Sequence, residues 1–208
     1  VWARPIQVAE GPCDVRISLY PDNDQVEYEV SVQTEDQQPV ICSQGRLFPE
    51  HKGLPADEPI DIEGVKKRCS RIKSGAECYT YFENQGLRYG PGFRPVEELF
   101  YNKTEALSRL KLPLHLRPAS DEFVLHPTIT DGALQTVAGL LNGENGGLYI
   151  PFSLGRTDFL EPLTEECYAY AIRTGNGDLG TYNIQLTDLS GRVLMRMNDF
   201  AVRSAARP

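Results

Sequence analysis

One ten-residue stretch in the second half of the chain holds the side chains best suited to chemistry. It reads His126-Pro-Thr-Ile-Thr-Asp131-Gly-Ala-Leu-Gln135. If this stretch is helical, the side chains of Asp131 and Gln135 stand on one face, because they are four residues apart. A carboxyl group beside an apolar cavity loses solvation, so its pKa rises and it can stay protonated. The spacing therefore predicts a general acid, Asp131, with an amide beside it.

Each of these residues also has a purely structural interpretation, and the spacing alone leaves both open. Thr128 lies three residues before Asp131, which matches a capping box in which the acid only satisfies amides at the helix start. His126 precedes a proline and is expected to be a structural hydrogen-bonding group more than a base. Tyr89, in a Tyr-Gly-Pro sequence, either packs in a turn or faces a ligand.

The helix that must position Asp131 is the clearest element in the sequence. Between Pro127 and Asn142, apolar residues recur at intervals of three and four, which predicts a buried helix. Gly132 and Gly139 are seven residues apart on nearly the same side, and each costs about 1 kcal/mol relative to alanine in a helix. We therefore expect another part of the backbone to approach the helix closely. The apolar stripe consists of Leu134, Val137, Ala138 and Leu141.

The first 47 residues show the patterns of β-strands. Alternating apolar positions between turn residues predict an antiparallel meander over residues 5–9, 13–20, 26–34 and 40–47. One face of such a sheet must be covered, yet the sequence before Pro55 offers no helix to cover it. We therefore expect the first half to lack an element or to receive it from elsewhere.

The second half predicts a more complete set of elements. A short helical run is expected over residues 62–73, and residues 96–101 and 105–112 read as a hairpin. A long helix followed by antiparallel strands, with glycines that let the sheet wrap closely around it, predicts a hotdog fold. The fold class is therefore α+β, a double hotdog of antiparallel sheets wrapped on a central helix, with the first hotdog incomplete. The four strands after the helix are expected at 148–153, 167–174, 181–188 and 193–204.

Three segments follow from this pattern. Residues 1–50 hold the remaining strands of the first hotdog, residues 51–61 form a linker rich in proline and charge, and residues 62–208 form the second hotdog. The sequence starts at Val1 without a methionine and directly in strand-like residues. We therefore expect it to be a piece of a longer protein.

Composition argues against several classes of function. A net charge of -8 at pH 7 gives a negative surface that repels nucleic acid phosphates and anionic lipid. The five cysteines contain no Cys-x-x-Cys pair, and an odd number cannot all form disulfides within the chain, which favours a reducing cytoplasm. The sequence has no membrane-length apolar run, phosphate loop, nucleophile elbow or metal-ligand spacing. We expect no nucleic acid, membrane or metal partner.

Three segments resemble motifs of polyketide synthase dehydratase domains, in the order of that family. Residues 86–93, Gly-Leu-Arg-Tyr-Gly-Pro-Gly-Phe, resemble Gly-Tyr-x-Tyr-Gly-Pro-x-Phe, and residues 126–135 resemble His-Pro-x-x-x-Asp-x-x-x-Gln. Residues 149–153, Tyr-Ile-Pro-Phe-Ser, resemble Leu-Pro-Phe-Ser. The opening Trp-Ala-Arg-Pro and the strands up to Leu47 are similar to the rear of the family's first hotdog. Within this family, the sequence is most similar to dehydratase domains from assembly lines that are served by a separate acyltransferase.

The resemblance implies an enzyme that removes water from a 3-hydroxyacyl thioester. The substrate would be carried on the phosphopantetheine arm of an acyl carrier protein, with no other cofactor. Asp131 would protonate or hold the leaving 3-hydroxyl group, and Gln135 would orient Asp131. Neighbouring polyketide synthase domains are implied as further partners, and a homodimer as one form of assembly. The residues expected to bind the substrate, in a tunnel between two hotdogs, are Tyr89, Gly90, Pro91, His126, Pro151 and Phe152.

The sequence departs from the family pattern at the catalytic base. The family takes the 2-proton with a histidine in a His-x-x-x-Gly-x-x-x-x-Pro motif, upstream of the Trp-x-x-Pro strand. The histidines here are His51, His115 and His126, and His51 has glycine and proline at the wrong spacing. We therefore expect the parent domain to be a dehydratase and this chain to lack its base. The alternatives are an inactive structural or docking domain, a pyran-forming cyclase, or a double-bond isomerase, against which the presence of Asp131 argues.

Overall fold

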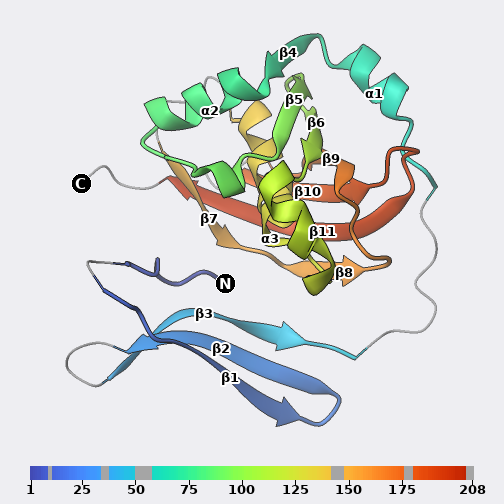
Figure 1. Cartoon of the computed structure of the whole chain (residues 1–208). Helices are drawn as coiled ribbons and strands as arrows, with labels where there is room; N and C mark the ends of the chain where they lie inside the picture. Colours follow the sequence, from blue (N-terminus) through green and yellow to red (C-terminus); the bar gives the residue numbers. More distant parts are fainter. Residues whose placement is uncertain (9–10, 34–37, 50–57, 142–147, 176–179, 205–208) are drawn as a thin grey trace. The chain divides into compact units, whose positions relative to one another are not determined.

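We describe the protein from a computed structural model of the whole chain (Figure 1). The chain forms two compact units, the first from residues 1–55 and 151–153 and the second from the rest. Part of the expected linker, including His51, lies outside the described residues. The description covers residues 1–8, 11–33, 38–49, 58–141, 148–175 and 180–204.

The first unit contains a three-stranded antiparallel sheet in the order β1-β2-β3. Its strands are β1 (Val15–Asp22), β2 (Gln25–Gln33) and β3 (Pro39–Leu47). The register places Ile17 of β1 opposite Val30 of β2, and directly opposed side chains share a face. The sheet therefore has one apolar face, as expected, and no helix lies among the described residues of this unit. The apolar side chains of β1 and β2 on it are Val15, Ile17, Leu19, Tyr28, Val30 and Val32.

The prediction of a strand over residues 5–9 is wrong for residues 5–8, the part of this range that the structure describes. Residues 5–8 form no strand. Instead Trp2 forms an isolated antiparallel bridge with Ser43, and the amides of Ala3 and Arg4 both donate to the carbonyl of Cys42. Pro5, which follows, has no N–H to continue this pairing.

The second unit is built on a larger sheet. Seven strands follow the order β4-β5-β6-β9-β10-β11-β7, and β8 pairs with β11 off this path. The pairs between β4, β5, β6, β9, β10 and β11 along this path are antiparallel, as is β8 with β11. The strands are β4 (Arg71–Ser74), β5 (Val96–Tyr101), β6 (Glu105–Lys111), β7 (Tyr149–Ser153), β8 (Arg156–Phe159), β9 (Glu166–Arg173), β10 (Gly180–Thr187) and β11 (Val193–Ser204).

The helix expected at 127–142 is present but shorter. Helix α3 (Pro127–Gln135) is followed by a 3₁₀ turn, η3 (Thr136–Gly139). Both pack against β6 and β9, and their side chains are buried nearly all round. The α-helix gives way to a tighter 3₁₀ turn, in which the amide of Leu140 donates to the carbonyl of Val137, three residues before it, at 2.8 Å.

The two helical glycines lie where the sheet comes closest. A Cβ added at Gly132 would lie 2.6 Å from Cγ of Pro95, and one at Gly139 would lie 2.9 Å from Cβ of Tyr101. The expected approach of another backbone is therefore wrong in its detail, because the nearest atoms at both glycines belong to side chains. The glycines let α3 and η3 sit directly on the strands.

Two further helices precede the hairpin β5–β6. Helix α1 (Ile62–Arg68) is shorter than the run expected over residues 62–73, because Cys69 is extended and β4 pairs with β5. Helix α2 (Gly75–Asn84) begins with a capping box between Ser74 and Glu77, and it carries Tyr79, Tyr81 and Phe82. Two 3₁₀ segments complete the unit, η1 (Pro91–Phe93) and η2 (Leu114–Glu122).

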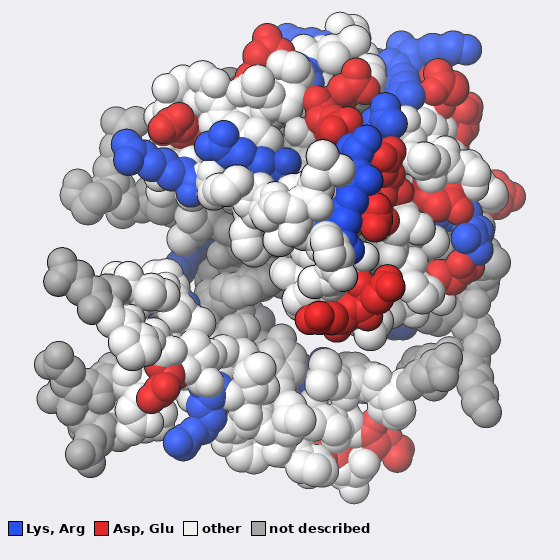
Figure 2. Space-filling model, in the orientation of Figure 1, with Lys and Arg blue, Asp and Glu red and all other residues white. Residues whose placement is uncertain are grey.

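The surface mixes both signs of charge. On the face of the second unit that Figure 2 presents, basic side chains form a band flanked by acidic ones. Glu166 of β9, for example, pairs with Arg109 and Lys111 of β6. All five cysteines are free, and four of them are buried, Cys13 being the exception. Among the described residues, no helix has the length and apolar character needed to cross a membrane.

Candidate active site

The start of α3 is capped by the residue before it. His126 is buried, and its Nδ1 accepts a hydrogen bond of 3.2 Å from the Thr128 amide. Burial lowers the pKa of His126, so the imidazole is neutral and Nδ1 keeps the lone pair that caps the helix. Phe123 packs on the ring, with centroids 4.9 Å apart. His126 therefore has the structural role that its position suggested.

Asp131 is not part of a capping box. The hydroxyl of Thr128 donates to the carbonyl of Gly92 at 2.7 Å, and Asp131 lies in the second turn of α3. Its carboxylate oxygen Oδ2 accepts a hydrogen bond of 2.7 Å from Nε2 of Gln135. The side chains that are four residues apart therefore meet as predicted, and the capping interpretation is wrong.

Two opposing effects act on the acidity of Asp131. Burial raises the pKa of its carboxyl group, because desolvation disfavours the charged form, and the hydrogen bond from Gln135 acts in the opposite direction. Burial is the larger effect, so the net shift is upward. Among the described residues, no hydrogen bond reaches the second oxygen, Oδ1. Gln135 thus holds one oxygen of the carboxyl group and leaves the other without a hydrogen-bond partner among the described residues.

Gln135 is buried, and its amide forms three hydrogen bonds. Nε2 donates to Asp131 and also to the carbonyl of Phe93, at 3.1 Å. Oε1 accepts a hydrogen bond of 3.0 Å from the hydroxyl of Tyr79 on α2. The amide therefore ties three parts of the second unit together: α2, α3 and the segment that contains η1.

The segment 89–93, which ends in η1, is bonded to α3 at two carbonyls, those of Gly92 and Phe93. Arg94 adds a third restraint, since its Nε donates to the carbonyl of Tyr89 at 2.8 Å. The Tyr89 ring packs edge-on against Phe82, with centroids 5.1 Å apart. Burial, and to a smaller extent the charge of Asp131, raises the pKa of Tyr89. The structure thus brings Tyr89 into the surroundings of Asp131.

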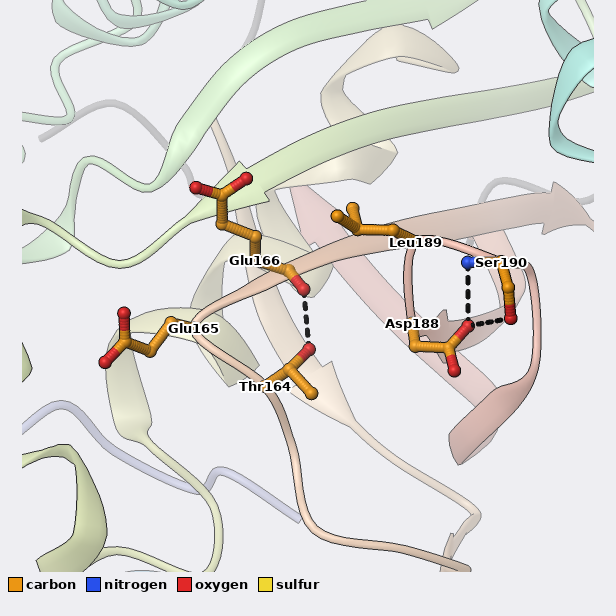
Figure 3. Close-up of a pocket in the computed structure, with 6 residues that line it drawn as sticks. All are labelled: Thr164, Glu165, Glu166, Asp188, Leu189 and Ser190. Atoms are coloured by element: carbon orange, nitrogen blue, oxygen red, sulfur yellow. Dashed lines mark hydrogen bonds between the residues drawn. The ribbon is translucent and has the colours of Figure 1, made fainter.

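A shallow depression of about 460 Å³ lies elsewhere on the second unit, where the start of β9 meets the end of β10 (Figure 3). Its acidic groups are already engaged. Glu166 pairs with Lys111, and Asp188 binds Ser190 and Arg192. We assign it no chemistry. Its lining residues are Thr164, Glu165, Glu166, Asp188, Leu189 and Ser190.

Comparison with known proteins places this chain in a family. Residues 58–208 match the family model described as the polyketide synthase dehydratase N-terminal domain. Polyketide synthase PksN of Bacillus subtilis is 34% identical over 98% of this chain, and polyketide synthase ThaG of Burkholderia thailandensis is 31% identical over 99% of it. The chain belongs to the polyketide synthase dehydratase family. It spans only 4% of the length of each of these two relatives.

Solved structures of dehydratase domains share the fold. A dehydratase domain of a trans-acyltransferase polyketide synthase from Brevibacillus brevis is 28% identical and superposes with a TM-score of 0.91, covering 99% of this chain and 74% of that one. The dehydratase domain from the CurF module of the curacin polyketide synthase is 24% identical, with a TM-score of 0.81 over 91% of this chain and 67% of that one. The expected α+β class and hotdog architecture are confirmed.

The predicted site residues of this dehydratase domain are only partly brought together. Asp131, Gln135 and His126 lie on or at the start of α3, and the segment of Tyr89, Gly90 and Pro91 is pinned against it. Pro151 and Phe152 lie on β7, in residues that group with the first unit. Their part in substrate binding stays a prediction.

Sequence reasoning missed Tyr79. This residue is 56 positions from Gln135 along the chain, so no local spacing could connect the two. The available signal was weak: Ser74 and Glu77 form the Ser-x-x-Glu pattern of a capping box, which predicts a helix that carries Tyr79. Among the described residues, no group of three His, Cys, Asp or Glu side chains is arranged to hold a metal ion.

Proposed function

We propose that this dehydratase domain removes water from a 3-hydroxyacyl group bound as a thioester to an acyl carrier protein. The observation that carries the proposal is the Asp131 carboxyl group, whose pKa is raised by burial and whose Oδ2 is held by Gln135. A carboxylic acid that stays protonated can donate to a leaving hydroxyl group. Membership in the dehydratase family supports the same reaction.

A base removes the proton from C2 of the acyl chain, the bond between C3 and the hydroxyl oxygen breaks, and a double bond forms between C2 and C3. Asp131 gives its proton from Oδ1 to the departing oxygen, so that water leaves. The hydrogen bond from Gln135 to Oδ2 stabilises the carboxylate that this transfer produces. Tyr89, beside Asp131, is proposed to contact the 3-hydroxyl group.

The base is assigned to a histidine outside these 208 residues, as the family resemblance implies. His126 caps α3 with a lowered pKa, and His115 is exposed on η2. His51 lies outside the described residues. This chain is therefore proposed to supply the acid half of the catalytic pair.

The proposed setting is a synthase of the trans-acyltransferase type in the cytoplasm. The likeness to the trans-acyltransferase dehydratase domain from Brevibacillus brevis and the small share of its relatives that this chain spans support it. The partners would be an acyl carrier protein, whose phosphopantetheine arm carries the substrate, and the neighbouring synthase domains, with a homodimer as a further proposal. No other cofactor is needed, because acid–base elimination transfers only protons.

The test compares variants in the synthase module that contains this chain. Asp131→Asn should lower the rate of dehydration of a 3-hydroxyacyl carrier protein by about 10²- to 10⁴-fold, the usual contribution of a positioned acid. Mass spectrometry of the acyl carrier protein detects the loss of water. Asp121→Asn, which changes an exposed aspartate on η2, is the matched control.

Equal turnover by the Asp131→Asn and Asp121→Asn variants would reject Asp131 as the acid. A module that leaves the 3-hydroxyacyl group intact would instead identify an inactive domain. A product that has lost water but has no double bond between C2 and C3 would point to isomerisation or ring closure.

A further inference from the structure

A chain of hydrogen bonds runs from the backbone of β5 to the carboxyl group of Asp131. The amide of Val96 donates to the Tyr79 hydroxyl at 2.9 Å, and that hydroxyl donates to Oε1 of Gln135 at 3.0 Å. Nε2 of Gln135 then donates to Oδ2 of Asp131 at 2.7 Å. Tyr79 and Gln135 are 8% and 5% exposed, so water competes little for these bonds.

The first hydrogen bond in this series, from Val96 to Tyr79, fixes the direction of donation in the bonds that follow. A backbone N–H can only donate, so the Tyr79 oxygen must be the acceptor toward Val96. The hydroxyl hydrogen of Tyr79 is then left for its other neighbour, the Gln135 amide, which must present its oxygen there. The NH₂ end of Gln135 consequently faces Asp131 and the carbonyl of Phe93.

The opposite orientation of the amide would place acceptors against acceptors. Oε1 of Gln135 would then face Oδ2 of Asp131 and the carbonyl of Phe93, both of which need donors. An oxygen beside the carboxylate would destabilise its charged form, whereas an N–H stabilises it. The orientation of one amide therefore decides how readily Asp131 gives up its proton.

We propose that Tyr79 is a positioning residue that selects the orientation of the Gln135 amide and thereby holds Asp131 ready to donate its proton. The proposal rests on the proposed role of Asp131 as the acid. Tyr79 is itself fixed by aromatic neighbours: its ring centroid lies 6.1 Å from that of Phe82 and 6.0 Å from that of Tyr89. It acts on the substrate only through Gln135.

Removing the Tyr79 hydroxyl has a predictable effect on the pH dependence. Dehydration requires protonated Asp131, so the rate falls as the pH rises through the pKa of Asp131. In Tyr79→Phe the Gln135 amide is free to turn its NH₂ group away, and the carboxylate loses a donor. The pKa of Asp131 should then rise further. The basic limb of the kcat profile, which is the fall in kcat at high pH, should therefore move to higher pH.

The experiment measures kcat, KM and the pH profile of dehydration in the synthase module that contains this chain. Tyr79→Phe should lower kcat by about 10- to 100-fold through misplacement of the acid, leave KM nearly unchanged, and move the basic limb upward by several tenths of a pH unit or more. Tyr81→Phe is the matched control, because it removes a hydroxyl group from the same helix, α2, away from Gln135. It should change none of these quantities.

A double-mutant cycle separates positioning from general structural support. If Tyr79 acts through Gln135, then Gln135→Ala alone should move the basic limb as far as the double variant with Tyr79→Phe does. Additive effects would overturn the proposal, as would a basic limb that stays in place in Tyr79→Phe.

If Tyr79→Phe fails to melt cooperatively, 3-fluorotyrosine at position 79 keeps the ring and the hydroxyl but donates more strongly. The basic limb should then move to lower pH, and no movement, or movement to higher pH, overturns the proposal.

The outcomes separate this inference from the proposed function. If Asp131→Asn retains full turnover, the acid role fails and the inference fails with it. If Asp131→Asn is impaired while Tyr79→Phe matches Tyr81→Phe in kcat and pH profile, only the inference on Tyr79 fails.

Discussion

Glu105 of β6 is a nearly buried carboxylate whose partners are one cation and two neutral donors. Arg68 donates to both of its oxygens at 2.9 Å, Tyr170 donates at 2.7 Å and Asn102 at 3.0 Å. These bonds, chiefly the two from Arg68, lower the pKa of Glu105 from 4.5 to about 2 against the effect of burial. Because Arg68 is half-exposed, solvent and salt weaken its contribution.

Folding stability should depend on pH through Glu105. The folded chain binds this proton less tightly than the unfolded chain, since folding lowers the pKa. The resulting stabilisation is complete above pH 4.5 and is lost as the pH falls toward about 2. Glu105→Gln should remove this part of the acid-side slope, and Arg68→Met should reduce it. Urea unfolding followed by circular dichroism over this range measures the slope, and an unchanged slope in Glu105→Gln would contradict the assignment.

The candidate site was predictable at the residue scale only where its contacts are local. Asp131 and Gln135 are one helical turn apart, so their meeting follows from helix geometry and the structure confirms it. Tyr79 joins them from α2, across a contact that exists only once the helices pack. The choice between a capping box and a buried acid also needed the fold, because the Thr128 hydroxyl is drawn to the carbonyl of Gly92.

At the scale of elements, the contact between η3 and the sheet depends on Gly139. A methyl group there would lie 2.9 Å from Cβ of Tyr101 and 3.1 Å from Cβ of Ala106. These atoms are attached directly to the backbone, so the strands would have to shift. We expect Gly139→Ala to destabilise the fold by about 1–3 kcal/mol, the usual cost of overpacking.

Urea unfolding measures this difference. Gly11→Ala is the control, because no atom lies within 4 Å of the added methyl group, and it should change stability by less than about 0.5 kcal/mol. Equal stability of the two variants would show that η3 has room to move.

Elements with a strong periodic pattern were predicted well, and those fixed by tertiary pairing were not. The strands expected at 26–34 and 193–204 match β2 and β11 closely. Apolar residues alternate along β2, whereas β11 contains runs of consecutive apolar residues that are buried. The edge strand β4 was read as helix, since its four residues are set by pairing with β5. The short strand β8 was missed for the same reason.

At the scale of the whole molecule, the sheet of the first unit should make the 208-residue chain self-associate. Three apolar side chains on one face of β1, those of Val15, Ile17 and Leu19, are 50%, 67% and 58% exposed. Contiguous exposed apolar side chains favour association. Light scattering should therefore detect species larger than a monomer.

The double variant Ile17→Lys and Leu19→Lys should shift the chain toward the monomer. Ser18→Lys adds a charge on the other face of the same strand and should not. A wild-type chain that stays monomeric at high concentration would rule out association through this face.

The burial of the cysteines sets how the chain responds to thiol reagents. Cys42 is 3% exposed, and burial raises the pKa of Cys69 and Cys78 to about 11 and that of Cys167 to about 12. Only a thiolate reacts readily, and Cys13, just before β1, is the one thiol that is not buried. The chain thus carries a natural attachment point: a maleimide dye added to the native protein would label the first unit at Cys13 and leave the four buried cysteines unlabelled.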